Sequence, residues 1–296
     1  MLCSKNACRN EENPFQLETP PKLHVYPMTA WTETKAPLVL VLLTSFFLRL
    51  GNPRFIYWTN EGDDRIQRAR IGVWVPEDVA LNAVFLETLD VDDGTKTLYW
   101  GERVNLARVV HNISLDNIPP PDASGGDTFF NTLDNPRGIA LDSTNQVMLY
   151  TMTGASGVNN GVYEFDVVTR ISTPLQIYSG ESLRHCAVDP IRQNVYYTIT
   201  TINEVRRISY TGSNEIVVSA GRFIFGVAFD SVNDYLYATV RDMDEVVRFN
   251  YDGASFVVLY NATDGVGSAP RGIDYDPLSN SIYWAATNDD VYVSQQ

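Results

Sequence analysis

Residues suited to catalysis are scarce in this sequence. Its 296 residues include three histidines, His24, His111 and His185, and no H-E-x-x-H, G-x-S-x-G or glycine-rich phosphate-loop motif occurs. A lone histidine is far more often a hydrogen-bonded strand residue than a ligand or a base. We therefore predict that the protein is not an enzyme, and that it has no catalytic residue, no metal site and no cofactor.

Cysteine is also rare, with Cys3, Cys8 and Cys186 in the whole chain. Two thiols without a second pair nearby are a weak signal for a disulfide or a metal site, and Cys186 lies in an apolar stretch typical of a small buried thiol. Residues 1–37 show neither helical nor strand periodicity and carry five prolines. We expect 1–37 to be a disordered tail or an artefact of the gene model.

Basic residues are too few for nucleic-acid binding. The chain has 22 Lys and Arg against 36 Asp and Glu, a formal net charge of −14, whereas a nucleic-acid-binding domain needs a basic face. This balance favours solubility and, if the partner is charged, a protein with a basic surface.

The apolar run at 38–50, LVLVLLTSFFLRL, is too short to span a bilayer, which takes about 20 residues. It suits the core of a signal peptide starting at Met28, but no small-x-small cleavage site follows it. Alternatively the run supplies two β-strands, of which 38–43 would be the fourth strand of a final repeat that otherwise has three. Closure of that kind removes exposed sheet edges, and we favour it.

An internal repeat dominates the rest of the chain. The stretch 222–260 predicts four strands separated by Asp-rich and Asp-Gly turns. A Leu, Ile or Val followed by Tyr recurs at intervals of about 40 to 50 residues, the period of a propeller blade. The six anchor tyrosines are Tyr57, Tyr99, Tyr150, Tyr196, Tyr237 and Tyr283. They predict an all-β, six-bladed β-propeller of four-stranded antiparallel blades.

An aspartate precedes most of these anchors at a constant distance. It stands seven residues ahead in four repeats, at Asp92, Asp189, Asp230 and Asp276. Asp142 stands eight residues ahead of Tyr150, which we interpret as a one-residue insertion in the turn. Regular recurrence once per repeat indicates a structural hydrogen bond, because a catalytic set would occur once per protein.

The anchors IYWTN (56–60), LYWGE (98–102) and IYWAA (282–286) resemble the YWTD repeat of the low-density lipoprotein receptor family, and 135–142 and 269–276 resemble its P-x-G-I-x-x-D strand. The resemblance implies a six-bladed propeller over 38–296. It implies structural roles at Tyr57, Trp58, Tyr99, Trp100, Asp142, Asp189, Asp230, Asp276, Tyr283 and Trp284. Three blades lack the Trp, and the cysteine-rich modules that flank such propellers are missing, so the chain would be a divergent member.

One face of the propeller should carry the turns between second and third strands together with the links between blades. Acidic residues are frequent there, and a ring of carboxylates attracts a basic partner. The expected rim consists of Glu61, Asp63, Asp64, Glu102, Glu204, Asp242, Asp244, Glu245, Asp289 and Asp290. The alternative is that these residues serve turn formation alone, because Asp side chains accept backbone N–H bonds in turns.

Two N-glycosylation sequons, at Asn112 and Asn261, give mild support for an extracellular setting. By resemblance we expect a non-enzymatic extracellular domain that binds a protein partner through this acidic face. Two alternatives are a nidogen-like structural or adhesive matrix module and, less favoured, a lactonase-like hydrolytic propeller with His185 near the channel.

Overall fold

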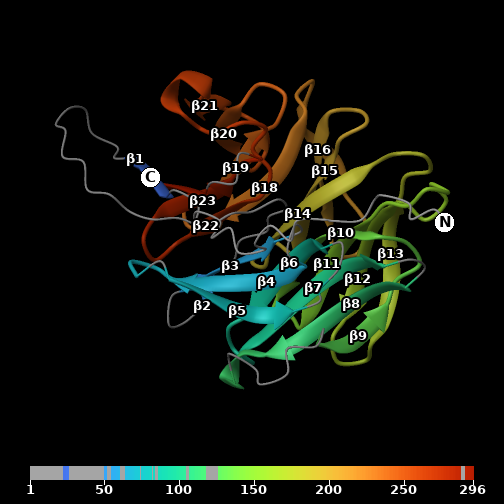
Figure 1. Cartoon of the computed structure of the whole chain (residues 1–296). Coiled ribbons are helices and arrows are strands. Elements are labelled where there is room, and N and C mark those ends of the chain that lie inside the picture. Colours follow the sequence, from blue (N-terminus) through green and yellow to red (C-terminus); the bar gives the residue numbers. More distant parts are fainter. Residues whose placement is uncertain are drawn as a thin grey trace, which may run out of the picture.

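The chain forms a six-bladed β-propeller, which confirms the predicted fold class (Figure 1). The computed structural model describes residues 23–26, 50–51, 55–60, 64–73, 75–81, 83, 86–104, 107–117, 126–287 and 291–296. Strands in these residues form six four-stranded sheets. The helices described are the short 3₁₀ turns η1 (Leu115–Asn117) and η2 (Ala262–Asp264), and no described helix has the length and apolar character needed to cross a membrane.

The blades follow one another along the chain. Blade one consists of β2 (Leu50–Gly51), β3 (Phe55–Asn60), β4 (Arg65–Arg70) and β5 (Pro76–Leu81). Blade two consists of β6 (Leu86–Asp92), β7 (Thr97–Val104), β8 (Ala107–Ser114) and β9 (Asp127–Asn131). Blade three consists of β10 (Pro136–Asp142), β11 (Val147–Met152), β12 (Gly161–Asp166) and β13 (Ile171–Ile177). Blades four and five consist of β14 (Leu183–Asp189), β15 (Asn194–Ile199), β16 (Glu204–Ser209) and β17 (Ile216–Ala220), and of β18 (Ile224–Asp230), β19 (Tyr235–Val240), β20 (Glu245–Asn250) and β21 (Val257–Tyr260).

Blade six is completed by a strand from near the start of the chain. It contains β22 (Ile273–Asp276), β23 (Ser281–Ala285) and β24 (Val291–Gln295), and its outer strand is β1 (Leu23–Tyr26), which pairs with β24 in parallel. Figure 1 shows β1 beside the C-terminal end. The expectation of an unstructured 1–37 was therefore wrong for Leu23–Tyr26. The strand that we predicted at 38–43 lies outside the described residues.

The core is divided among the interfaces between neighbouring blades. Six apolar clusters are present, one for each interface around the ring. The cluster that joins blade six to blade one contains Tyr283 and Ala285 on one side and Ile56, Trp58 and Ala69 on the other. Because each blade presents both of its faces to neighbours, its strands are apolar on both sides.

Side-chain alternation along the second strand of each blade serves these two interfaces. In blade four, Tyr196 packs toward blade five and the next residue, Tyr197, packs toward blade three. In blade three, Leu149 packs toward blade four and Tyr150 toward blade two. Consecutive residues of the second strand therefore point toward opposite neighbouring blades, as the period of two in a strand requires.

This alternation corrects the alignment of blade three. Ala140 pairs with Leu149, as Ala187 pairs with Tyr196 in blade four. Leu149 therefore takes the anchor position and Tyr150 the position that Trp occupies elsewhere. Asp142 is then seven residues ahead of the anchor, and the turn insertion that we inferred was wrong.

Candidate functional site

The repeated aspartates stabilise the turn between the first and second strands of their blades. We call Asp92, Asp142, Asp189, Asp230 and Asp276 the turn aspartates. Asp230 is fully buried, and its Oδ1 accepts hydrogen bonds from the backbone N–H groups of Val232 and Asn233 at 2.8 and 3.0 Å, while Asn233 Nδ2 donates to Oδ2. Asp234, which follows Asn233, has a positive φ. The equivalent residues of the other four turns also have a positive φ; they are Lys96, Gln146, Gln193 and Asn280.

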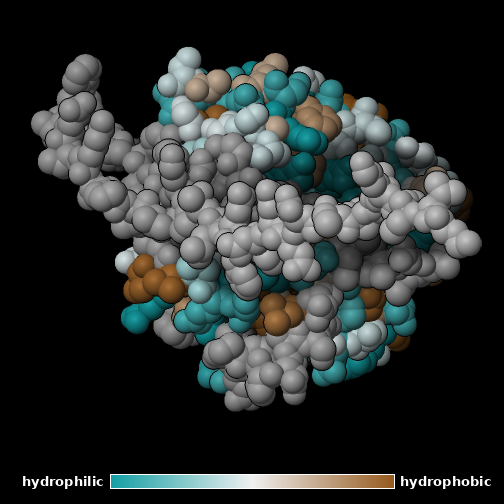
Figure 2. All heavy atoms as spheres, viewed as in Figure 1, coloured by the Kyte–Doolittle hydropathy of each residue, from teal (hydrophilic) through white to brown (hydrophobic). Residues whose placement is uncertain are grey.

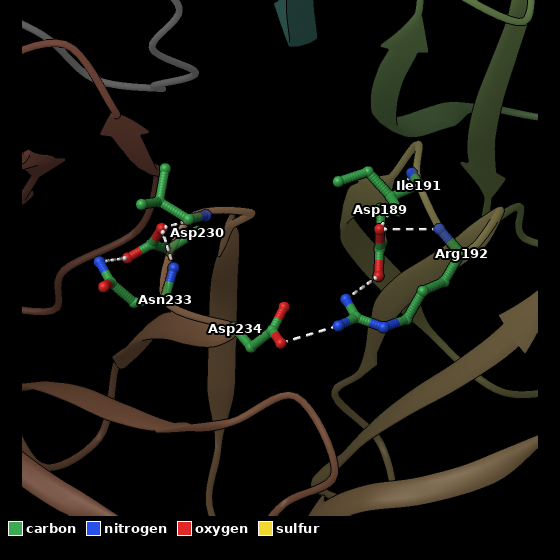
Figure 3. Close-up of polar contacts among 7 residues, drawn as sticks. Asp189, Ile191, Arg192, Asp230, Asn233 and Asp234 are labelled. Carbon is green, nitrogen blue, oxygen red and sulfur yellow. Dashed lines mark hydrogen bonds and ion pairs between the residues drawn. The ribbon is translucent and has the colours of Figure 1, made fainter.

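One of these turns also links two blades. Arg192 donates from Nη1 to Asp189 at 2.9 Å and from Nη2 to Asp234 of the next blade at 2.7 Å. Figure 3 shows the guanidinium bridging the two carboxylates. The two hydrogen bonds to Asp234 and Asp189 raise the pKa of Arg192. These turns lie on the face opposite the predicted acidic rim, because strands alternate in direction within a blade.

The predicted rim is only partly described, since Glu61, Asp63, Asp289 and Asp290 lie outside the described residues. Placing Glu102 on the rim was wrong. The β7–β8 hairpin continues beyond it, so Glu102 is buried within β7, where it accepts a hydrogen bond from Trp100 Nε1 at 2.8 Å. His111 Nε2 lies 3.5 Å from the Glu102 carboxylate and its ring stacks on Trp100.

Two further rim carboxylates are paired with arginines. Glu204 contacts Arg206 Nε at 2.6 Å, and Glu245 contacts Arg222 Nη1 at 2.5 Å. Each carboxylate is therefore neutralised by a cation on the same side of the molecule. These pairs reduce the negative field that the sequence predicts for this face.

The remaining rim residues differ in what they contact. Asp64 and Asp244 both have a positive φ at the end of a second-to-third-strand turn, and Asp244 Oδ1 accepts from the N–H of Ala269 in the following link at 2.6 Å. Asp242 is exposed, and its side chain makes no hydrogen bond or ion pair within the described part of the chain. Turn geometry thus accounts for Asp64 and Asp244, and Asp242 is left as a free surface charge.

Arginines gather at the centre of the same face. Three guanidinium carbons, of Arg184, Arg241 and Arg271, lie 5.7, 5.5 and 5.9 Å from the ring centroid of Phe225. Arg137 lies near them and pairs with Glu87. We call Arg137, Arg184, Phe225, Arg241 and Arg271 the channel-mouth cluster, because it is built largely on the innermost strands, where those strands begin.

We did not predict this cluster, although the sequence contains a signal for it. Counting five residues back from each turn aspartate gives one position in each of blades two to six. The residues there are Glu87, Arg137, Arg184, Phe225 and Arg271. We name this the mouth position. Three arginines at a single repeat position of an acidic protein indicate that their charges share one environment.

Buried threonines hold the mouth positions in place. Thr151, Thr198 and Thr239 are fully buried, and each donates from its hydroxyl to a backbone carbonyl of the next blade. The acceptors are the carbonyls of Arg184 at 2.6 Å, Phe225 at 3.1 Å and Arg271 at 2.5 Å. The backbone of three mouth residues is therefore fixed by the preceding blade, which places their side chains on a rigid support.

His185 follows Arg184 in β14 but points into the interior. Its side chain is almost completely buried, and Nδ1 accepts from the N–H of Val227 at 3.4 Å. Burial lowers its pKa to about 4, so the ring is neutral at physiological pH. Within the described residues no group of three or more His, Cys, Asp or Glu side chains is placed to hold a metal ion.

The two predicted glycosylation sites sit in different settings. Asn112 lies within β8, where it pairs with Tyr99 and Asp127 on the neighbouring strands. Asn261 is the N-cap of η2, and its Oδ1 accepts hydrogen bonds from the N–H and the hydroxyl of Thr263 at 2.8 and 2.6 Å. Asn261 therefore lies outside the sheets and Asn112 within one, and both side chains are half-buried.

Comparison with known proteins gives a fold without a sequence family. No family model and no curated protein sequence matches this chain. Among solved structures, a chain of a nidogen/laminin complex is similar with a TM-score of 0.62 and 14% identity, over 81% of this chain and 97% of that one. A hydrazine synthase chain from Kuenenia stuttgartiensis has a TM-score of 0.67 and 13% identity, over 98% and 99%. Such different proteins share the architecture, so the fold alone does not assign an activity.

Proposed function

We propose that this chain is a non-enzymatic, extracellular protein-binding propeller that contacts its partner through the face carrying the second-to-third-strand turns. The observation that carries the proposal is the uneven charge of that face. Asp242 is exposed on this face and has no cation partner among the described residues. Arg184 and Arg241 stand at its centre, also with no described carboxylate partner. Free charges of both signs on one rigid face suit a complementary protein surface.

The opposite face supports the non-enzymatic part of the proposal. The turn aspartates, which are the carboxylates that recur through the blades, are occupied by hydrogen bonds within their own turns. They are therefore used for folding rather than left available for proton transfer. The likeness to a chain of a nidogen/laminin complex supports a protein partner and an extracellular setting, and the sequon at Asn261, whose Thr263 is exposed, agrees with that setting.

A nidogen-like adhesive module is the alternative, and the salt dependence of binding separates the two. Attraction through exposed charges is screened within about 8 Å at physiological ionic strength, whereas apolar adhesion is not weakened by salt. Figure 2 shows that hydrophilic residues cover most of the described surface in that view, with separate hydrophobic patches between them. The exposed charge of Asp242 on the proposed face favours recognition through charge.

The test uses the tagged full chain produced in secretory cells and an immobilised extracellular-matrix preparation as the binding probe. Asp242→Lys should weaken binding to the matrix, and added NaCl should weaken it in the wild type. Asp252→Lys, which makes the same charge reversal in an exposed turn of the opposite face, is the matched control. Equal binding by the wild type and the Asp242→Lys variant would remove the rim from the proposal. Retention of the protein inside the cells without a glycan would overturn the extracellular assignment.

A further inference from the structure

Four arginines share a small volume in the mouth of the central channel. Arg184, Arg241 and Arg271 come from three consecutive blades, and their guanidinium groups approach one ring, that of Phe225. Cation–π attraction to a single phenyl ring is modest, and all three distances are near the upper limit of about 6 Å at which it acts. The aromatic ring is therefore too weak a partner to balance Arg184 and Arg241.

Described carboxylates do not balance Arg184 and Arg241 either. Glu87 is the acidic member of the mouth position, and it is paired with Arg137. Arg184 and Arg241 form no hydrogen bond or ion pair through their guanidinium groups with any residue that the structure describes. The charges that act on Arg184 are mostly those of other arginines.

Gathering like charges costs free energy, and the lowered pKa of Arg184 reflects this cost. Burial together with the charges of Arg137, Arg241 and Arg271 lowers the pKa of Arg184 to about 10, against the opposing charge of Glu87. The cost is greater because part of the cluster is removed from water. It arises in a chain whose formal net charge is −14, so the arginines are concentrated against the overall composition.

We propose that the channel mouth binds an oxyanion, a carboxylate or phosphate group, held by Arg184, Arg241 and Arg271 above the ring of Phe225. Planar guanidinium forks donate paired hydrogen bonds to groups of this kind. The threonine hydroxyls that fix the carbonyls of Arg184 and Arg271 preorganise two of the three donors. A bound anion would also remove the repulsion among the cations.

This inference extends the proposed function. It rests on that function in one respect, because the carboxylate would be an Asp or Glu side chain of the protein partner. A free phosphate ion offers the same chemistry without a partner. Titration with small anions therefore tests the site independently of matrix binding. Failure of the anion titration with intact rim-dependent matrix binding would overturn this inference alone.

The experiment is calorimetric titration of the full chain at low ionic strength with sodium phosphate and, separately, with N-acetyl-aspartate amide, each against an NaCl blank of equal ionic strength. We expect saturable binding of one anion per chain. Arg241→Gln and Arg184→Gln should each weaken it at least tenfold. Glu87→Gln should strengthen it severalfold, because it frees Arg137 and removes a competing carboxylate; a purely structural role for Glu87 would not have this effect.

Arg170→Gln is the matched control, since Arg170 is an exposed arginine on the third-to-fourth-strand turn of blade three, at the opposite face. Thermal melting of each variant shows whether it is folded, and the two single-arginine variants give independent tests if one of them is not. Binding of phosphate but not of the aspartate derivative identifies a free ion as the ligand, and the reverse identifies a partner's side chain. The proposal would be overturned if neither anion showed saturable binding at about 10 mM, which is well above a weak 1 mM dissociation constant. It would also be overturned if Arg170→Gln lost as much anion binding as Arg184→Gln and Arg241→Gln.

Discussion

The hydroxyl of Thr198 donates to the backbone carbonyl of Phe225 in the next blade at 3.1 Å and accepts from the N–H of His185 in its own blade at the same distance. A single buried side chain thus joins blades four and five at the edge of the channel. The same arrangement recurs at Thr239, which accepts from Gly226 and donates to Arg271. These hydroxyls connect the repeat sequence to the channel-mouth cluster.

Replacement of Thr198 by valine keeps the shape of the side chain and removes its hydroxyl. The carbonyl of Phe225 and the N–H of His185 would then be buried without this partner. We expect the free energy of unfolding to fall by roughly 1–3 kcal/mol, measured by urea denaturation. Thr173→Val, at an exposed position of β13, should change it by less than about 0.5 kcal/mol, and equal effects would contradict this role.

Asp230 and Asp234 allow a comparison within a single turn. Asp230→Asn keeps an oxygen for the two backbone N–H groups, but it replaces the buried Oδ2, which accepts from Asn233 Nδ2, with a second donor. It should cost roughly 1–3 kcal/mol of stability. Asp234→Asn weakens a bridge whose Asp234 and Arg192 side chains are 40% and 35% exposed, and should cost less than about 1 kcal/mol. The two melting curves, recorded under one set of conditions, decide the order.

Gly226 tests the close approach between blades five and six. A Cβ at this position would stand 2.2 Å from the backbone carbonyl oxygen of Arg271. Gly226→Ala should therefore destabilise the protein by about 1–3 kcal/mol or more, as overpacking does. In Gly94→Ala the nearest atom is a side-chain oxygen of Asp92 at 3.3 Å, and a similar loss in that variant would show that the blade contact is not the cause.

The burial of His185 predicts that the protein loses stability in mild acid. Its folded-state pKa of about 4 lies below the usual 6.5, so the unfolded chain takes up a proton first as the pH falls. Stability is retained above pH 6.5 and declines between pH 6.5 and 4. By pH 5 the loss should be about 2 kcal/mol.

The measurement for His185 is the urea midpoint at pH 7 and at pH 5. In His185→Gln the difference between the two midpoints should shrink, because glutamine does not titrate. Other groups contribute equally to both proteins, so an unchanged difference would show that His185 does not control the pH dependence.

The sequence predicted the architecture because the same turn recurs in five blades. An aspartate whose carboxylate accepts backbone N–H bonds must stand at a fixed distance from the next strand, and this spacing is visible without a structure. In blade three we assigned the anchor position to the wrong residue, because Leu149 and Tyr150 are both apolar. Only strand pairing shows which of the two faces which neighbouring blade. In blade one, which lacks the aspartate, strand pairing places Gly51 opposite Phe55, at the position where the other blades have it.

The site was harder to predict, since charge in a sequence does not show what each charge contacts. Glu204 and Glu245 looked free in their turns, but Arg206 and Arg222 neutralise them. Arg222 comes from the link between blades, which sequence spacing does not relate to Glu245. Arg184 and Arg271 are distant in the chain and meet only because blades four and six both adjoin blade five.

The parallel pairing of β1 with β24 has a consequence for the order of folding. Neighbouring blades are adjacent in the chain, so most interfaces close short loops, whereas Leu23 meets Val291 with nearly the whole chain between them. The entropic cost of loop closure grows with the length of the loop, and contacts of long sequence separation slow folding. We therefore expect the blades to assemble as an open arc, with the attachment of β1 as a late kinetic step that converts the arc into a ring.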